Sequence, residues 1–203
     1  MKKLDIKKEL KEYYSPSSKE VSIVRIPSFR FLMIDGKGNP NSAPEYADAV
    51  ETLFSTAYTI KFMIKKTKEN IDYGVLPLEG LWWVPNMKDF SAERKEDWLW
   101  KMMIMQPDFV TDEIFRDAVG SVRRKKNLAA IDKLTFESFD EGLSAQILYH
   151  GPYSGEAPTI ARLHDAIKNS GHSLSGKHHE IYLNDPRRTA SEKLKTIIRQ
   201  PMI

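Results

Sequence analysis

Residues 150–158 read His-Gly-Pro-Tyr-Ser-Gly-Glu-Ala-Pro, and residues 36–44 read Gly-Lys-Gly-Asn-Pro-Asn-Ser-Ala-Pro. Each stretch is a glycine-containing turn that ends in Ala-Pro, and proline is favoured in the first turn of a helix. A segment rich in apolar and β-branched residues, typical of a strand, precedes the first turn at 21–34. Before the second turn, residues 134–149 predict one strand, or two strands broken near Asp140-Glu141-Gly142. The two stretches therefore predict the same order twice: a strand, a glycine turn and a proline-started helix.

The predicted helix of the first half begins with a capping-box pattern, in which Ser42 is followed three residues later by Glu45. Its apolar residues recur at helical spacing: Tyr46, Val50, Leu53, Ala57, Ile60 and Ile64. A separate helix is expected from Thr111, with acidic residues in its first turn and the basic run 123–126 at its end. That basic run is interpreted as a solvated helix terminus.

Two further strand candidates follow the helix in each half, at 71–84 and 98–105 and then at 179–183 and 193–199. The last strand of each half closes with a shared K-x-x-I-x-Q-P pattern, beginning at Lys101 and at Lys195. Neither short match is strong alone. The same order of elements around both indicates an internal repeat.

These patterns predict an α+β fold, in which a tandem pseudo-two-fold repeat of β-α-β-β modules forms an antiparallel sheet with helices packed on one face. We expect a single domain over 1–203, with module one at about 20–107, a linker helix at about 111–127 and module two at about 131–201. Pockets often occur where two substructures meet, so a ligand pocket is expected between the modules.

Composition limits the classes of function. The formal net charge of +3 is small for 203 residues, so nucleic acid is not expected as the main partner. The chain has no cysteine, which excludes disulfides, thiolate metal sites and a cysteine nucleophile. No signal peptide and no apolar run of membrane-spanning length is present, so a cytoplasmic protein without membrane association is expected. Nucleotide-binding glycine motifs and the G-x-S-x-G motif are missing, and no cofactor is expected.

Four stretches carry a resemblance to a known family: the turn and helix start at 36–44, PLEGLWW at 77–83, YHGPY at 149–153 and EIYLNDP at 180–186. On these residues the chain resembles the GyrI-like small-molecule-binding family, whose fold also forms the effector domain of BmrR-type transcription regulators. The last two stretches are the most specific, and the resemblance covers roughly 21–200.

The resemblance implies a tandem two-module domain that binds hydrophobic, often cationic or aromatic, compounds. It implies that Glu180 is the pocket carboxylate, with Tyr149, Tyr153 and Tyr182 among the pocket aromatics. Because little sequence precedes Val21, a stand-alone protein is expected rather than one fused to a DNA-binding domain. Some stand-alone members hydrolyse cyclopropane-bearing, DNA-alkylating natural products within an aromatic cage, and the tryptophan content here is similar. A role in resistance to toxic compounds follows as an expectation.

The residues themselves support a site around Glu180. In a strand, alternation places Glu180 and Tyr182 on one face and Ile181 on the other. If that face lines a crevice, burial would raise the pKa of the carboxyl, which could pair with a cationic ligand or accept a proton from water. An exposed glutamate at a strand end is the competing interpretation. Tyr149 and Tyr153 flank a Gly-Pro turn and could donate hydrogen bonds to a ligand carbonyl, or simply pack there.

Tryptophans are the second unusual feature, and the candidates for ligand binding are Trp82, Trp83, Trp98 and Trp100. Adjacent tryptophans in a strand point to opposite faces, whereas Trp98 and Trp100 share one. Such stripes more often fill a core than surround a ligand. Glu79 lies at strand spacing from Trp83, and a carboxylate on an aromatic face suits a ligand cation or a developing carbocation.

A metal site at His178-His179-Glu180 is rejected, because adjacent histidines on a strand point apart and no further ligand pair has suitable spacing. Two hypotheses remain for function. One is a hydrolase that opens strained rings with Glu180 as base and Tyr149 as donor; the other is a passive binding module or a partner-regulating protein.

Overall fold

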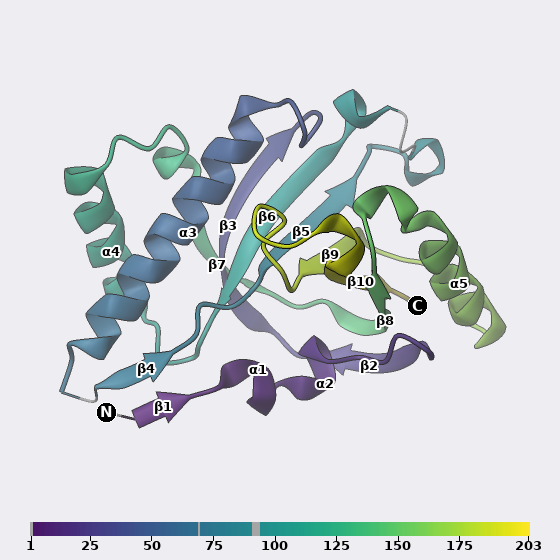
Figure 1. Ribbon diagram of the computed structural model, residues 1–203, viewed down its shortest axis with the longest axis horizontal. Coiled ribbons are helices and arrows are strands. Elements are labelled where there is room, and N and C mark those ends of the chain that lie inside the picture. Colours follow the sequence, from purple (N-terminus) through teal and green to yellow (C-terminus); the bar gives the residue numbers. More distant parts are fainter. Residues whose placement is uncertain (1, 69, 91–93) are drawn as a thin grey trace. The chain divides into compact units, whose positions relative to one another are not determined.

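The computed structural model describes residues 2–68, 70–90 and 94–203. Contacts between Cα atoms divide the chain into two compact units that interleave along the sequence. Unit 1 consists of residues 1–9, 29–76 and 83–139, and unit 2 consists of residues 10–28, 77–82 and 140–203. Figure 1 shows the ribbon with its elements labelled.

The strands of unit 1 centre on β3 (Phe29–Lys37), which pairs antiparallel with β6 (Leu99–Gln106) on one side and β7 (Thr135–Phe139) on the other. In the β3–β6 register, Gly36 lies opposite Trp100, whose indole covers the glycine so closely that an added Cβ would meet the ring at 2.0 Å. Only glycine fits at this position, which explains one of the two glycines in the first turn. A short parallel pair, β1 (Lys2–Leu4) with β4 (Ile71–Tyr73), completes the strands of this unit.

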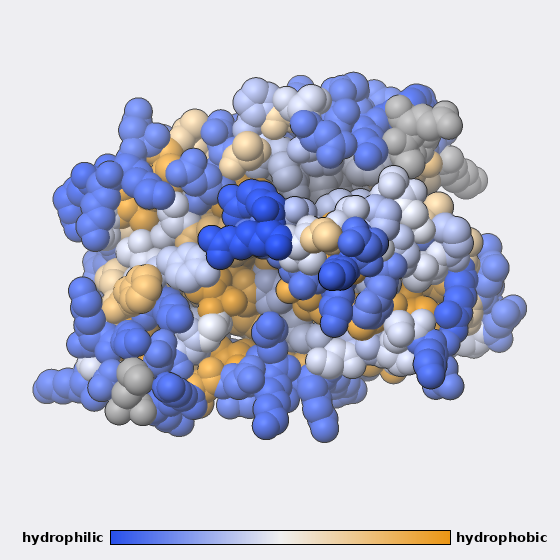
Figure 2. Space-filling view, in the orientation of Figure 1, coloured by the Kyte–Doolittle hydropathy of each residue, from blue (hydrophilic) through white to orange (hydrophobic). Residues whose placement is uncertain are grey.

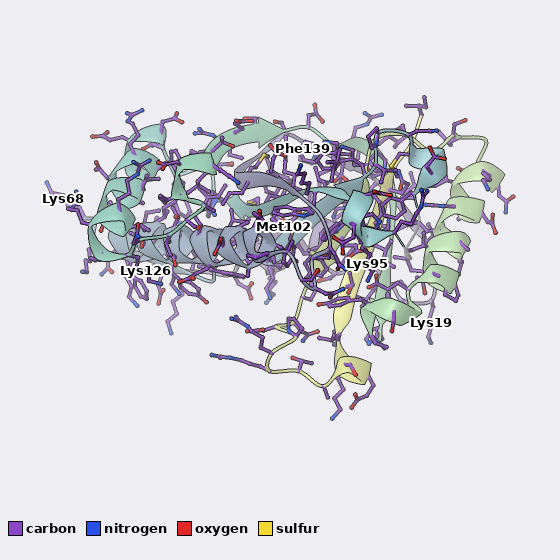
Figure 3. The ribbon with its side chains drawn as sticks, turned by 90° about the horizontal axis from the view of Figure 1, so that it is seen from above. Lys19, Lys68, Lys95, Met102, Lys126 and Phe139 are labelled. Carbon is purple, nitrogen blue, oxygen red and sulfur yellow. The ribbon has the colours of Figure 1, made fainter. Side chains whose placement is uncertain are left out.

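Helix α3 (Pro44–Lys65) packs on β3 and β6. Its buried residues recur at helical spacing: Ala49, Thr52, Leu53, Thr56, Ala57, Ile60 and Ile64. Met102 of β6 is fully buried and lies beside α3 in Figure 3. The predicted capping box is wrong in detail, because the N-cap is Ala43 in an extended conformation and no side chain caps the helix. Pro44 is the first helical residue, as the sequence indicated.

Helix α4 (Asp112–Lys125) packs on α3 and begins as predicted. The Thr111 hydroxyl accepts a hydrogen bond from the Ile114 backbone N–H at 3.2 Å, which satisfies one of the free donors of the first turn. Short elements complete unit 1: α1 (Ile6–Glu9) and the 3-10 turns η1 (Met87–Asp89), η2 (Lys95–Asp97) and η3 (Ile131–Lys133).

Unit 2 contains strands in the order β2-β8-β10-β9-β5, and each printed pair is antiparallel. Their bounds are β2 (Ser22–Ile26), β8 (Gly142–His150), β10 (Lys195–Pro201), β9 (His178–Tyr182) and β5 (Leu78–Trp83). Helix α5 (Ala157–Asn169) packs on β8 and β10. Its Leu163 and Ile167 join a core with Ala145, Ile147 and Ile198, so the helix covers one face of these strands.

The glycine turn that precedes α5 has the backbone geometry expected of it. Gly151 has a φ of 138°, a value that residues with a Cβ rarely adopt. The 3-10 turn η4 (Tyr153–Gly155) then leads into α5, whose first turn contains Pro158. Two further short elements belong to unit 2, α2 (Lys11–Tyr14) and η5 (Ser191–Lys193).

The α+β class is confirmed. Along the chain, β3 and α3 are followed by β4, β5 and β6, and β8 and α5 are followed by β9 and β10. Apart from the additional short strand β4, this order is compatible with a repeat. The repeat itself and the predicted module boundaries stay predictions. The single strand expected over 21–34 is wrong, because Pro27 and Ser28 separate β2 from β3. The elements β1, α1 and α2 were not anticipated, since their sequence has little apolar periodicity.

Candidate functional site

Strand β9 presents different side chains to its two faces. His178, Glu180 and Tyr182 contact one another on one face, while His179 belongs to a separate network on the other. This division follows from the two-residue period of a strand. It confirms that Glu180 and Tyr182 share a face, and it shows that His178 joins them.

Glu180 is held by hydrogen bonds to both carboxylate oxygens. Its Oε1 lies 3.0 Å from Nε2 of His178, and its Oε2 accepts a hydrogen bond from the Tyr182 hydroxyl at 2.7 Å. The side chain is 15% exposed. The competing interpretation of a fully solvated glutamate at a strand end therefore does not hold.

A second carboxyl group, that of Glu156, also hydrogen-bonds to Glu180. Glu156 is buried and lies just before α5, at the end of the glycine turn. This contact favours the ionised form of Glu180 and so lowers the pKa of its carboxyl. Sequence patterns did not point to Glu156, because an acidic residue beside a helix start is usually a cap.

The pKa of Glu180 is lower than usual. Burial by itself raises the pKa, but the hydrogen bond and charge of His178, followed by hydrogen bonds from Tyr182 and Glu156, outweigh burial. The expected upward shift is therefore wrong in direction, because hydrogen bonds to the ionised form favour that form. Glu180 is an ionised carboxylate near neutral pH, suited to pairing with a cation.

Aromatic side chains adjoin this carboxylate. Trp82 of β5 donates its indole N–H to the Tyr182 hydroxyl at 3.0 Å. The ring of Tyr153 meets that of Tyr182 edge-on, with centroids 5.6 Å apart. Burial, followed by the negative charges of Glu180, Glu156 and Asp185, raises the pKa of Tyr153 to about 12. The Tyr182 hydroxyl donates to Glu180, and the Tyr153 hydroxyl stays protonated at neutral pH. We call the whole group the Glu180 cluster: Trp82, Tyr153, Glu156, His178, Glu180 and Tyr182.

Tyr149 lies in the same turn but makes a different contact. Its hydroxyl donates to the carbonyl oxygen of Pro152 at 3.0 Å, and its ring lies against Gly151 and Gly155. It also lines an open hollow of about 420 Å³ in unit 2, formed by Ser18, Leu148, Tyr149, His150, Thr159 and Arg162. The contacts of Tyr149 therefore support a role in shaping the turn, and its predicted role as donor stays a prediction.

The other face of the strands holds a buried ion-pair network, which consists of Tyr14, Glu79, Glu141, His179 and Arg199. His179 lies between two carboxylates, with its Nε2 3.0 Å from Glu79 and its Nδ1 2.8 Å from Glu141. Tyr14 donates to the second oxygen of Glu79 at 2.7 Å, and Arg199 donates to the second oxygen of Glu141 at 3.1 Å. All four carboxylate oxygens therefore have partners.

In this network, two positive charges balance the charges of the two carboxylates, Glu79 and Glu141. The two carboxylates and the one guanidinium leave one negative charge to be compensated, and protonation of His179 supplies the positive charge. Although burial lowers the pKa of His179, Glu141 and then Glu79 raise it to about 9. Burial raises the pKa of Glu141, but His179 and Arg199 lower it below the usual range. Arg199 also donates to Gln146 and to the Tyr13 carbonyl, which ties α2 to β8 and β10.

Glu79 was predicted to bind ligand, but both its oxygens are engaged in this network and the residue is 1% exposed. These contacts support a stabilising role.

Three of the predicted tryptophans belong to unit 1. Trp98 stacks on Phe90 at 4.9 Å, Trp100 packs edge-on against Tyr46 in the core, and Trp83 is half-buried at the end of β5. Their predicted ligand-binding role stays a prediction.

The adjacent histidines point to different partners, as the strand period indicates. Within residues 2–68, 70–90 and 94–203, no group of three or more potential ligands has the geometry of a metal site. Glu141, Arg199 and His178 were missed as partners because their positions along the sequence do not show that they meet.

Family comparison adds to this geometry. A profile described as the GyrI-like small molecule binding domain matches residues 19–202. The chain belongs to this family. As a GyrI-like protein it is a small-molecule-binding domain, in agreement with the resemblance. No curated protein matches the chain.

Solved structures similar to this GyrI-like chain fall into two groups. An uncharacterized conserved protein from Listeria innocua shares 39% identity with a TM-score of 0.90, over 98% of this chain and 100% of that one. A hydrolase from Listeria innocua shares 38% identity with a TM-score of 0.88, over 100% of both chains. The C-terminal domain of EcmrR shares 12% identity with a TM-score of 0.55, over 91% of this chain and 97% of that one, which shows a common fold.

In the part of the chain that the structure describes, no helix combines the length and the apolar character needed to cross a bilayer.

Proposed function

We propose that this GyrI-like chain captures hydrophobic small molecules, aromatic, cationic or electrophilic, at the Glu180 cluster, and that it hydrolyses strained cyclopropyl compounds among them. The observation that carries the proposal is a mostly buried, ionised Glu180 set beside the rings of Tyr182 and Tyr153. Two Listeria innocua structures described as hydrolases share 36% and 38% identity over nearly the whole chain, which supports a hydrolytic role.

Binding follows from the chemistry of the cluster. A carboxylate with little contact to water attracts a cation more strongly than a solvated one does. Aromatic ring faces add to this attraction, because their quadrupole presents negative charge to a cation. The partly exposed rings of Tyr153 and Tyr182 also offer apolar area to the body of a ligand. The cluster therefore suits a flat, apolar molecule that carries or develops positive charge.

Hydrolysis of a cyclopropyl dienone needs three events. Water attacks the less hindered ring carbon, so that a carbon–oxygen bond forms as a carbon–carbon bond of the ring breaks. The released electron pair moves through the dienone to its carbonyl oxygen, which takes up a proton and becomes a phenol. Glu180 accepts the proton that the attacking water loses.

The proton for the carbonyl oxygen comes from a hydroxyl donor in the same mechanism. Tyr153 is better placed for this than Tyr149, because its ring adjoins Tyr182 whereas the Tyr149 hydroxyl donates to Pro152. Its pKa of about 12 keeps it protonated at neutral pH, so that it donates a hydrogen bond as charge develops on the oxygen. We therefore assign the donor role to Tyr153 in the proposal.

Incubation of the purified protein with a spirocyclopropyl cyclohexadienone tests the proposal, with ring opening followed by mass spectrometry. We expect many turnovers per protein molecule, and a loss of about a hundredfold or more in Glu180→Gln, which cannot accept the proton. The matched control is Glu192→Gln, an exposed glutamate of η5, which should retain full activity. Activity of Glu180→Gln equal to that of the control would refute the assignment of Glu180.

A binding function without turnover is the alternative, and the lowered pKa of Glu180 favours it, because a more acidic carboxyl is a weaker base. Fluorescence titration with rhodamine 6G, a cationic aromatic dye, separates the two functions. Binding that weakens in Glu180→Gln, together with no ring opening by the unchanged protein, would establish a binding module. If the protein shows neither binding of the dye nor ring opening, both forms of the proposal are rejected.

A further inference from the structure

Helix α3 carries three aromatic residues on its outer surface. Phe54, Tyr58 and Phe62 are spaced four residues apart, so they lie along one side of the helix. Neighbouring ring centroids are 6.4 Å apart in both pairs, with interplanar angles of 31° and 27°. The buried side of α3 faces its own strands through other residues, so this aromatic stripe is directed elsewhere.

The stripe is unusually exposed for aromatic side chains. Tyr58 is 47% exposed and Phe62 is 53% exposed, and Phe54 is half-buried. The other large apolar side chains that are exposed among the described residues come from separate elements: Ile23, Met87, Tyr153, Leu174 and Ile203. Figure 2 shows apolar surface between charged side chains on the part of this face where α3 and α4 lie. A contiguous apolar stripe with a charged rim is typical of an interaction surface.

Charges at the two ends of the stripe have opposite sign. Glu51 lies seven residues before Tyr58, and Lys65 lies seven residues after it. The carboxylate of Glu51 has Lys126 Nζ of α4's C-cap at 3.5 Å, and Lys65 Nζ lies 3.0 Å from Asp72. Lys126 is labelled beside α3 in Figure 3. The stripe is therefore symmetric in spacing about Tyr58 and antisymmetric in charge.

We propose that this stripe is a homodimer interface, in which α3 packs antiparallel against α3 of a second copy about a two-fold axis at Tyr58. In this arrangement Tyr58 meets its own copy, and Phe54 meets Phe62 of the other chain. Glu51 then faces Lys65 of the other chain twice, once on each side of the axis. A two-fold interface uses the same patch on both partners, which is the self-complementarity that the stripe has.

Electrostatics favour a second copy over other occupants. Across the interface, Asp72, Lys65, Glu51 of the other chain and Lys126 of the other chain form a line of alternating charge. If each of the three rings on each copy buries about half its side-chain surface, about 100 Å², the interface buries about 600 Å² in total. This area is small for a stable complex. The dimer is therefore weak and forms only at high protein concentration.

Sedimentation velocity of the full chain from about 5 to about 500 µM tests the interface over the range in which such a dimer forms. The weight-average sedimentation coefficient should rise with concentration. Tyr58→Glu places two like charges on the axis and should keep the protein monomeric throughout. Met87→Glu changes a residue that is 41% exposed and outside α3, and should dimerise like the unchanged protein. Circular dichroism confirms that each variant is folded.

Charge reversal tests the register. Glu51→Lys and Lys65→Glu each place like charges opposite one another twice, so each variant alone should dimerise at least tenfold more weakly. An equal mixture of the two should recover dimer, because the heterodimer again pairs opposite charges on both sides of the axis. Pairing within one chain cannot explain that recovery, since the two residues lie about 21 Å apart along the helix.

Three results would overturn the proposal: an unchanged protein that stays monomeric up to the highest concentration, a dimer that persists in Tyr58→Glu, or a mixture of the charge variants that does not recover association. A protein that is monomeric in solution but binds phosphatidylglycerol vesicles through Tyr58 would show that the stripe contacts a membrane instead.

Discussion

The charge on His179 makes stability depend on pH in a direction that can be calculated. The residue is 1% exposed, and its pKa rises from 6.5 to about 9 on folding. Because the folded pKa is the higher one, the stabilisation is fully present below about pH 6.5 and is lost as pH rises through about 9. A shift of this size corresponds to roughly 3 kcal/mol. We expect the free energy of unfolding to fall by about that amount between these limits.

Urea unfolding followed by tryptophan fluorescence at a series of pH values measures this dependence. In His179→Gln the side chain no longer titrates, so the protein should be less stable at neutral pH and its stability should be nearly flat over the same range. His150→Gln is the matched control, because His150 is exposed and outside the network, and it should retain the slope of the unchanged protein.

Two results would refute this reasoning about His179. One is an equal pH slope in His179→Gln and in the unchanged protein. The other is an imidazole nitrogen signal of a neutral ring in nuclear magnetic resonance spectra at pH 7. Either result would mean that Glu79 and Glu141 do not hold a proton on the histidine. The network would then carry an uncompensated negative charge, contrary to the charge balance inferred from the structure.

Three further changes have defined consequences. Arg199→Met leaves a buried carboxylate without its guanidinium and should lower the free energy of unfolding by about 3–5 kcal/mol in urea titrations; a loss below 1 kcal/mol would mean that water replaces the arginine. Gly36→Ala drives a methyl group into the Trp100 ring and should lower the free energy of unfolding by about 1–3 kcal/mol, with altered tryptophan fluorescence. Gly74→Ala is the control, because nothing lies within 4 Å of its added Cβ, and its effect should be far smaller. Equal effects of the two changes would contradict the packing. Thr111→Ala removes a cap and should cost about 1 kcal/mol, measured in the same way, and no change would show that the cap contributes nothing.

Local patterns in the sequence predicted most of the elements, because turns and helix starts depend on nearby residues. Gly151, Pro44 and Thr111 act within their own turns, and each occupies the position that its chemistry favours. The alternation in β9 likewise placed Glu180 and Tyr182 together, since the period of a strand does not depend on its neighbours. By contrast, Pro27 divides two strands that composition alone had joined.

The partners of the functional side chains could not be predicted in this way. Glu156 is 24 residues from Glu180, and Glu141 is 38 residues from His179, so no sequence spacing connects them. The direction of the Glu180 pKa shift was wrong for the same reason. Burial was the only effect that could be anticipated, and the hydrogen bonds that outweigh it come from side chains brought close by folding.

The amino-acid sequence by itself determined the α+β class, most of the strands and helices, the family resemblance and the placing of Glu180 with Tyr182 on one face of β9. Tertiary structure alone decided which carboxylate is ionised beside aromatic rings and which is locked in a buried ion-pair network, and it left one face of α3 uncovered. The physical reason is range: backbone preferences act over a few residues, whereas hydrogen bonds and charge pairs depend on distances that exist only after the chain has folded.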